Sequence, residues 1–189
     1  MIYFSVCSVI DEGKSASKDF HMTMEEDLEE VLRVWRTYSI SQAIFSKMIR
    51  FDKYKKSFVE ETRRRIHNVS FVGNVFIYDF DDGDLSMSEF TKRYDGKFNF
   101  LAVKSKNDHK YEYDRFKVMV VHDVLFVQST TTDGSPDGLQ TKDIGSYLDY
   151  YIGFAENYDF WQYCDHATKD ISRLSSNVAK EGDFYICQS

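Results

Sequence analysis

The sequence predicts an α+β fold, with a mostly antiparallel sheet and flanking helices. Short runs rich in β-branched and aromatic residues predict strands, and they are interspersed with segments whose apolar residues recur at helical spacing. Two of the strand-like runs, 97–103 and 115–121, are joined by a polar stretch, which is typical of a hairpin with a charged tip. Strand–helix–strand order combined with a hairpin indicates an α+β protein whose sheet is mainly antiparallel.

Length and composition predict one domain that spans residues 1–189. The chain is 42% hydrophobic and 16% aromatic, which is sufficient for one full hydrophobic core. The net charge of −7 argues against a broadly basic surface for nucleic acid, so a polyanionic partner would have to be held by local cations or metal ions. Whether the domain is a whole protein or the N-terminal part of a longer one is left open.

The cysteines and the hydropathy pattern predict a soluble cytoplasmic protein with no membrane partner. Cys7, Cys164 and Cys187 are odd in number and lack a CxxC spacing, which suits reduced thiols better than a disulfide framework. No segment approaches about 18 consecutive apolar residues, and the N-terminus lacks a basic-then-apolar leader.

The first half of the chain is expected to begin with a strand at 1–10, a polar loop at 11–21 and then a helix. Thr23 is the expected N-cap of that helix, and Glu26 completes a capping box three residues later. Apolar side chains at helical spacing would form its buried face: Leu28, Val31, Leu32 and Trp35.

The segment 40–49 could be a strand or a helix, and the spacing of its apolar residues weakly favours the helix. The segment 58–67 is expected to be a helix that ends in a basic cluster. Cations at a helix C-terminus complement the helix dipole, and contact with phosphate is the functional alternative for them. The cluster consists of Arg63, Arg64, Arg65 and His67.

The second half of the chain opens on a clear helix signal. Ser86 and Glu89 form a capping box that predicts a helix over 87–94, which the Asp95–Gly96 step would end. The other expected elements are a loop at 130–141, a helix at 145–161 and a closing strand at 184–187.

The stretch 71–84, FVGNVFIYDFDDGD, is the strongest candidate for a functional site. Asp79 and Asp81 are two positions apart on its strand, so both side chains leave the same face. Two carboxylates held side by side repel unless a cation lies between them, which favours a divalent-metal site over a solvated acidic turn. Because the two charges repel, we expect the fold to tolerate the loss of either carboxylate. Oxygen ligands favour Mg²⁺ or Mn²⁺ over zinc.

The predicted hairpin brings cations near this acidic strand. Arg115 and Lys117 share one face of their strand, as Asp79 and Asp81 do. An acidic face beside a basic face suits a nucleoside triphosphate with bound metal, and a solvated hairpin with cross-strand charge pairs is the alternative. The hairpin tip adds Lys104, Lys106, His109 and Lys110.

Four motifs, in their order and spacing, resemble the archaeo-eukaryotic primase superfamily, and within it the phage and plasmid primase-polymerase branch. They are IYDFDDG at 77–83, VKSKNDH at 103–109, YDRFKVMV at 113–120 and CDHATKDISRL at 164–174. The resemblance covers about residues 70–175. It implies an RRM-like catalytic core within the α+β class.

The resemblance assigns three metal ligands. Asp79 and Asp81 match the carboxylate pair of the family's first motif, and Asp165 matches the aspartate of its third motif, with Asp170 as the alternative. Ser172 and Arg173 match the serine–arginine step that follows that aspartate. Asp79, Asp81 and Asp165 would then be the catalytic residues that hold two ions of Mg²⁺ or Mn²⁺.

The second motif of the family, a small residue, any residue and then histidine, has no clean match. One placement puts Lys104-Ser105-Lys106 at the motif, with His109 nearby, and the other puts Lys117 in the place of the histidine. The residues expected to bind the triphosphate are Ser105, His109, Arg115, Lys117 and Arg173.

The resemblance implies a template-directed nucleotidyltransferase, a primase/DNA polymerase that acts on single-stranded DNA with nucleoside triphosphates in phage or plasmid replication. A replicative helicase is a further partner that it suggests. The alternative is a catalytically inactive primase-like module that binds nucleic acid or a helicase. The DFD at 79–81 also suggests an aspartate-nucleophile phosphatase, but Gly83 stands where that chemistry usually has threonine.

Overall fold

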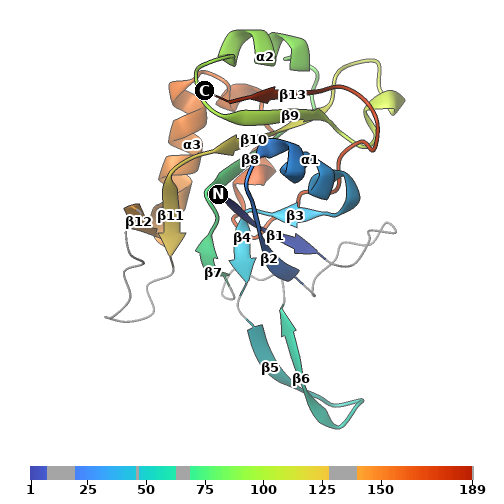
Figure 1. The fold of residues 1–189 in the computed structure, drawn as a ribbon, viewed down its shortest axis with the longest axis vertical. Coiled ribbons are helices and arrows are strands. Elements are labelled where there is room, and N and C mark those ends of the chain that lie inside the picture. The colour runs from blue at the N-terminus through green and yellow to red at the C-terminus, as the bar shows by residue number, and fades with distance from the viewer. Residues whose placement is uncertain (8–19, 46, 63–68, 128–139, 189) are drawn as a thin grey trace.

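The structure is a computed structural model that describes residues 1–7, 20–45, 47–62, 69–127 and 140–188. It is an α+β fold with mostly antiparallel strand pairs, as predicted (Figure 1). Among the described strand pairs, β11 with β12 is the parallel one.

The central sheet has the strand order β13-β9-β10-β8, and each neighbouring pair is antiparallel. Its strands are β8 (Val75–Phe80), β9 (Phe100–Lys104), β10 (Phe116–Val121) and β13 (Phe184–Cys187). Helix α2 (Met87–Tyr94) connects β8 to β9, and β10 lies between these two strands, which is a split β-α-β arrangement. The predicted hairpin and the predicted closing strand are therefore confirmed.

The central sheet buries side chains on both faces. Alternate residues of β8 lie in two different cores, because successive side chains of a strand point to opposite faces. Phe76, Tyr78 and Phe80 pack in an aromatic core with α2 and α3 (Tyr147–Asn157). Val75 and Ile77 pack on the other face. That second face also contacts α1 (Leu28–Thr37), whose buried residues are the four predicted ones.

The remaining strands form smaller sheets. The first is β2-β1-β3, built from β1 (Ile2–Cys7), β2 (Phe20–Glu25) and β3 (Ile40–Ser41). The second is β12-β11-β7-β4, built from β4 (Ala43–Phe45), β7 (Val69–Val72), β11 (Val124–Val127) and β12 (Gln140–Asp143). A two-stranded ribbon of β5 (Lys47–Asp52) and β6 (Ser57–Thr62) projects from the body of the domain (Figure 1).

Gly73 separates β7 from β8 and explains why the strand predicted across this region is broken. A Cβ at this position would lie 1.8 Å from the carbonyl oxygen of Tyr3, so only glycine permits the close approach of β1. The Gly73 N–H donates to the carbonyl of Gln42 at 2.8 Å.

The predicted helix α2 is confirmed together with its capping box. The Ser86 side chain accepts a hydrogen bond from the Glu89 N–H, and the Glu89 carboxylate accepts one from the Ser86 N–H. The helix predicted at 145–161 is confirmed as α3. None of the helices in the described part of the chain is long and apolar enough to cross a membrane.

The predicted start of the first helix was wrong. Thr23 lies within β2 and pairs with Phe4 of β1, and the N-cap is Asp27, whose side chain accepts a hydrogen bond from Glu30 N–H at 2.9 Å. The capping-box spacing of Thr23 and Glu26 is a coincidence, because backbone pairing with β1 makes Thr23 part of strand β2.

For segment 40–49 the strand alternative is confirmed, and the helix predicted over 58–67 was wrong, because these residues form strands β3 to β6 as far as the structure describes them. Ile44 and Phe45 pair with β7, so their apolar side chains serve a sheet and not a helix face. The basic cluster at 63–67, and most of the loop predicted at 130–141, lie outside the described residues.

Candidate functional site

A buried ion pair lies at the centre of the candidate site. The antiparallel register of β8 and β10 places Lys117 directly opposite Asp79. Lys117 Nζ lies 2.5 Å from both carboxylate oxygens of Asp79, and the two residues are only 6% and 5% exposed. Both side chains lie on the same face of the sheet as Val75 and Ile77. The charged pair is therefore at one end of a face that is otherwise aliphatic along β8.

A second ion pair lies beside the first, where the two strands end. Arg115 forms a bidentate ion pair with Asp81. Arg115 Nε lies 3.1 Å from Asp81 Oδ1, and Arg115 Nη2 lies 2.8 Å from Asp81 Oδ2. The hydrogen bond to Asp81 raises the pKa of Arg115 above its ordinary value. The guanidinium also lies 4.3 Å from the ring centre of Tyr111, and the Arg115 N–H donates to Asp108 at 2.7 Å. These contacts hold the arginine in one orientation.

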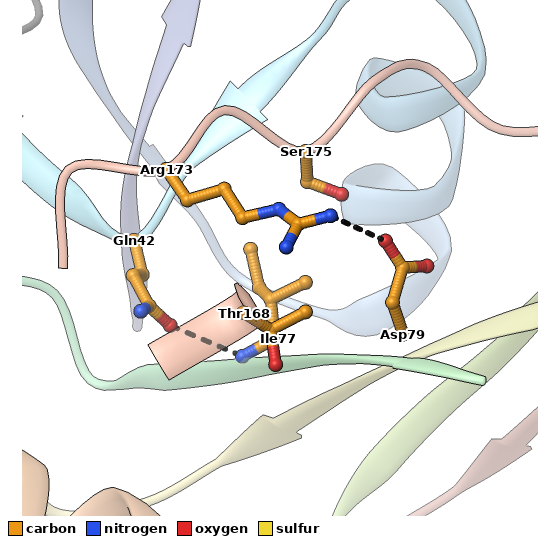
Figure 2. A pocket seen from close by; sticks show the side chains of 6 residues that line it. All are labelled: Gln42, Ile77, Asp79, Thr168, Arg173 and Ser175. Carbon is orange, nitrogen blue, oxygen red and sulfur yellow. Dashed lines mark hydrogen bonds and ion pairs between the residues drawn. The ribbon is translucent and has the colours of Figure 1, made fainter. Parts of the chain in front are cut away.

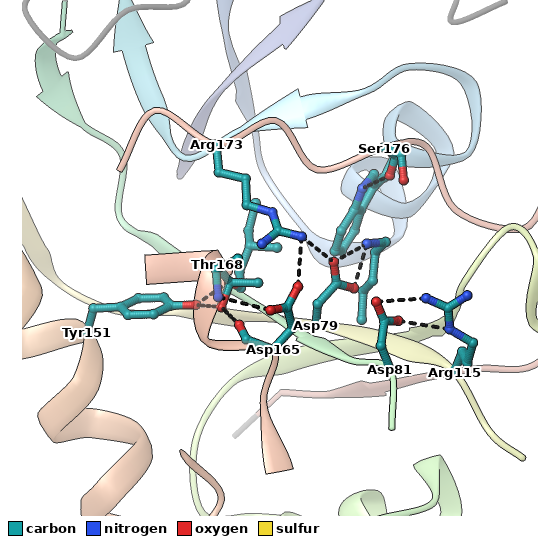
Figure 3. A network of polar contacts seen from close by, with 12 residues as sticks. Asp79, Asp81, Arg115, Tyr151, Asp165, Thr168, Arg173 and Ser176 are labelled. Carbon is teal, nitrogen blue, oxygen red and sulfur yellow. Dashed lines mark hydrogen bonds and ion pairs between the residues drawn. The ribbon is translucent and has the colours of Figure 1, made fainter. Parts of the chain in front are cut away.

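A third ion pair adds Asp165, which lies far from Asp79 in the sequence. Arg173 Nη2 lies 3.0 Å from Asp165 Oδ2 and 3.9 Å from Asp79 Oδ2, so it links the two carboxylates (Figure 3). Partial burial acts to raise the pKa of Asp165. The Ala167 N–H, the Arg173 guanidinium and, at longer range, Lys117 outweigh burial and bring that pKa below its ordinary value.

A set of hydrogen bonds fixes Asp165 against β8. The Asp165 N–H donates to the carbonyl of Asp79 at 2.8 Å, and the Asp165 side chain caps the short 3₁₀ helix η5 (His166–Lys169). The Thr168 hydroxyl donates to the Asp165 carbonyl at 2.7 Å. The Tyr151 hydroxyl of α3 lies 2.7 Å from both Thr168 Oγ1 and the Ile77 carbonyl (Figure 3). The buried tyrosine therefore connects α3, η5 and β8.

A cavity of about 410 Å³ opens over these ion pairs. Ser105 is 8% exposed, and its hydroxyl has no hydrogen-bond partner among the described residues. Such an unpaired buried hydroxyl is costly unless something else supplies a partner. The cavity is lined by Asp79, Asp81, Ser105, Lys106, Asn107, Arg115, Lys117, Arg173, Ser176 and Asn177.

A much smaller cavity of about 10 Å³ is lined by Gln42, Ile77, Asp79, Thr168, Arg173 and Ser175 (Figure 2). Gln42 accepts a hydrogen bond from the Ile77 N–H at 3.1 Å and donates to the Tyr147 hydroxyl. This space has room for about one water molecule. The larger cavity is therefore the one with room for a substrate.

The structure brings together most of the residues predicted for the site. The three carboxylates and three of the predicted cations form one ion-pair cluster: Asp79, Asp81, Asp165, Arg115, Lys117 and Arg173. Ser105 lines the same cavity. His109 is exposed on the 3₁₀ helix η2 (Asp108–Lys110) and does not line it. Asp170 is exposed and accepts hydrogen bonds from the Ser172 N–H and hydroxyl.

Among the lining residues that sequence reasoning missed are Ser176 and Asn177. They follow Arg173 in a segment with no periodic pattern, and long-range pairing carries them to the cavity. The Ser176 carbonyl accepts a hydrogen bond from Trp35 Nε1 at 3.2 Å, and Val178 forms a bridge with Ser105. A short polar segment gives no signal of such pairing.

The carboxylates suit Mg²⁺ or Mn²⁺ by their chemistry, since both ions favour oxygen ligands. Among the described residues, however, no group of three or more His, Cys, Asp and Glu side chains is arranged to hold one metal ion. Each of the three carboxylates is instead paired with a cation. Their role as metal ligands stays a prediction.

The fold and the cluster define a class of site: alternating charges at the end of an antiparallel sheet, beside a cavity large enough for a small ligand. Comparison with known proteins adds no family to this description. No family model, no curated protein and no solved structure matches the chain.

Proposed function

We propose that this chain is a template-directed nucleotidyltransferase, a primase/DNA polymerase that acts on single-stranded DNA in phage or plasmid replication with Mg²⁺ or Mn²⁺. One observation supports this function: three carboxylates and three cations form one ion-pair cluster, and all of them except Asp165 line a single cavity. The motif resemblance agrees with it, because the paired residues come from three of the four motifs. An RRM-like core, a single domain and a cytoplasmic location belong to the same proposal.

The balance of charge explains why the cluster would bind metal and nucleotide together. A triphosphate alone would meet the carboxylates of Asp79 and Asp81, and a divalent ion alone would meet Lys117 and Arg115. When the divalent ion and the triphosphate bind together, the carboxylates can bind the ion and the cations can bind the phosphates. We therefore expect each ligand to bind well only in the presence of the other.

Each residue has a role in this scheme. Asp79, Asp81 and Asp165 would hold the ions, which when bound lower the pKa of the primer hydroxyl and neutralise the leaving pyrophosphate. The cations would hold the phosphates, with the planar guanidinium of Arg115 suited to two oxygens at once. The unpaired hydroxyl of Ser105 would donate to the same ligand. His109 lies outside the cavity lining, so no contact in the cavity is assigned to it.

The decisive experiment is primer synthesis and extension on single-stranded DNA with labelled nucleotides and Mg²⁺ or Mn²⁺. Asp81 is partly exposed, so Asp81→Asn is the variant of choice, with the exposed Asp84→Asn as a matched control. We expect the first to lose product formation by roughly 100-fold or more and the control to keep it. Full activity of a folded Asp81→Asn variant would remove the basis for the proposal.

The second candidate is a catalytically inactive primase-like module that binds nucleic acid or a replicative helicase. The observation in its favour is the same set of ion pairs, since carboxylates already matched by cations do not require a metal. Isothermal titration with Mn²⁺ and a nucleoside triphosphate separates the two. The enzyme should show metal-dependent binding of the triphosphate, and the module should show none.

A further inference from the structure

A second hollow, of about 620 Å³, runs along helix α1. Four cations line it: Arg33 and Arg36 of α1, Lys106 at the end of the hairpin, and Lys180. Glu29 is the single acidic side chain among the described residues that line it. Glu30 pairs with Arg33, so the local excess of positive charge comes mainly from Arg36, Lys106 and Lys180, in a chain whose net charge is −7. We name it the α1 groove.

The α1 groove adjoins the candidate site. Lys106 and Asn177 line both the groove and the 410 Å³ cavity, and Lys106 Nζ lies 3.4 Å from Asn177 Oδ1. These two side chains therefore form the shared wall. A chain molecule bound in the candidate site would reach the groove by passing over them.

Backbone hydrogen bonds fix the walls of the groove. The Val178 N–H donates to the carbonyl of Trp35 at 3.1 Å, and the Ala179 N–H donates to the carbonyl of Lys104 at 3.2 Å. Segment 176–180 is thereby tied to both α1 and β9. Arg36 donates to the carbonyl of Gly182 at 3.2 Å, and its guanidinium lies 5.3 Å from the ring centre of Phe184. The groove is thus formed before any ligand binds.

We propose that the α1 groove binds the phosphate backbone of single-stranded DNA whose neighbouring nucleotides occupy the candidate site. A fixed groove lined by cations is how proteins follow a flexible single strand without reading its sequence. The choice of DNA as the occupant rests on the proposed function. The cations themselves call for an anionic ligand, and the two lining residues shared with the 410 Å³ cavity favour one long enough to contact both hollows.

The test is fluorescence anisotropy with a labelled oligothymidylate about 16 nucleotides long, the upper range of a single-strand site. The medium contains EDTA and no nucleotide, so the binding does not depend on catalysis. The double variant Arg33→Gln/Lys180→Gln changes two exposed groove cations, and Lys92→Gln/Lys97→Gln removes the same charge from exposed positions outside the groove. Arg36 is left in place because it also holds the Gly182 carbonyl.

We expect the groove variant to bind the oligonucleotide about 10-fold more weakly at low salt. The slope of log binding constant against log salt concentration should be smaller in magnitude by about 1.4, which is about 0.7 for each lost phosphate contact. The control should change neither quantity. Unchanged binding by the groove variant, or an equal loss in the control, would overturn the proposal. So would tighter binding of oligouridylate than of oligothymidylate, which would make RNA the occupant.

The two proposals fail in different ways. If the groove variant loses binding but the parent protein makes no primer, the groove stands as a DNA-binding surface and the enzymatic function fails. If the groove variant makes primers with the parent's affinity for template, the groove assignment fails and the enzymatic function stands.

Discussion

Lys117 and Asp79 face each other across β8 and β10, with the ammonium 2.5 Å from both carboxylate oxygens and both residues almost fully buried. From the sequence we expected the fold to tolerate the loss of either Asp79 or Asp81, because the two carboxylates would repel each other. The structure corrects this expectation, because Asp79 is the counter-charge of a buried lysine.

The variant Asp79→Ala is expected to lose about 3–5 kcal/mol of unfolding free energy, because it leaves Lys117 buried without a partner. The double variant Asp79→Ala/Lys117→Met should recover most of that loss, since no buried charge remains. Urea unfolding followed by circular dichroism measures both. A single variant as stable as the parent would show that the pair does not contribute to stability.

The variant Ser105→Ala separates a structural role of this hydroxyl from a ligand-binding role. The Ser105 hydroxyl is buried and unpartnered in the described structure, so its removal should leave stability unchanged within about 1 kcal/mol or raise it. Affinity for a nucleoside triphosphate with Mn²⁺ should nevertheless fall about 5- to 10-fold. Calorimetric titration measures the second quantity and thermal unfolding the first. Unaltered affinity would place the hydroxyl outside the binding site.

The Tyr151 hydroxyl is expected to act through Thr168 on the position of Asp165. Tyr151→Phe and Thr168→Val should each cost about 1–2 kcal/mol, because each removes part of one buried hydrogen-bond chain. The double variant should cost less than the sum of the two. Additive losses in a double-mutant cycle would show that the two side chains act independently.

His122 is expected to make stability fall as the pH is lowered. Burial lowers its pKa from 6.5 to about 4, so the folded state keeps the ring neutral while the unfolded state takes up a proton. The stabilisation is complete above pH 6.5 and is lost as the pH falls from there through about 4, which amounts to roughly 3 kcal/mol.

The matched variant is His122→Phe, because the ring of His122 lies 4.0 Å from that of Phe76 and an aromatic replacement keeps this contact. Unfolding free energies measured between pH 7 and pH 4 should decline less steeply in the variant than in the parent. Identical slopes would mean that His122 is not the responsible group.

The sequence predicted those features that depend on a few neighbouring residues. The capping box of α2 is one, and the shared face of Asp79 and Asp81 is another, because both follow from fixed local spacing. The segments that form β3 to β6 were left open or taken for a helix because their apolar spacing fits both periods and only pairing with another strand decides between them.

The ion pairs illustrate the same limit within the site. Arg115 and Lys117 were expected near the acidic strand, but strand register decides which cation meets which carboxylate. Register is set by the whole sheet and its core, so the choice of cation for Asp79 and Asp81 was not predictable from the motifs.

Burial of the Asp79–Lys117 pair also constrains how this sequence can evolve. A protein with an apolar pair at these positions could be as stable as the one with the charged pair. Two substitutions are needed to reach it, and after the first of them one buried charge has lost its partner on the facing strand. That intermediate is the least stable of the three. Loss of both charges would therefore require two changes together, whether or not the pair has a role beyond the fold.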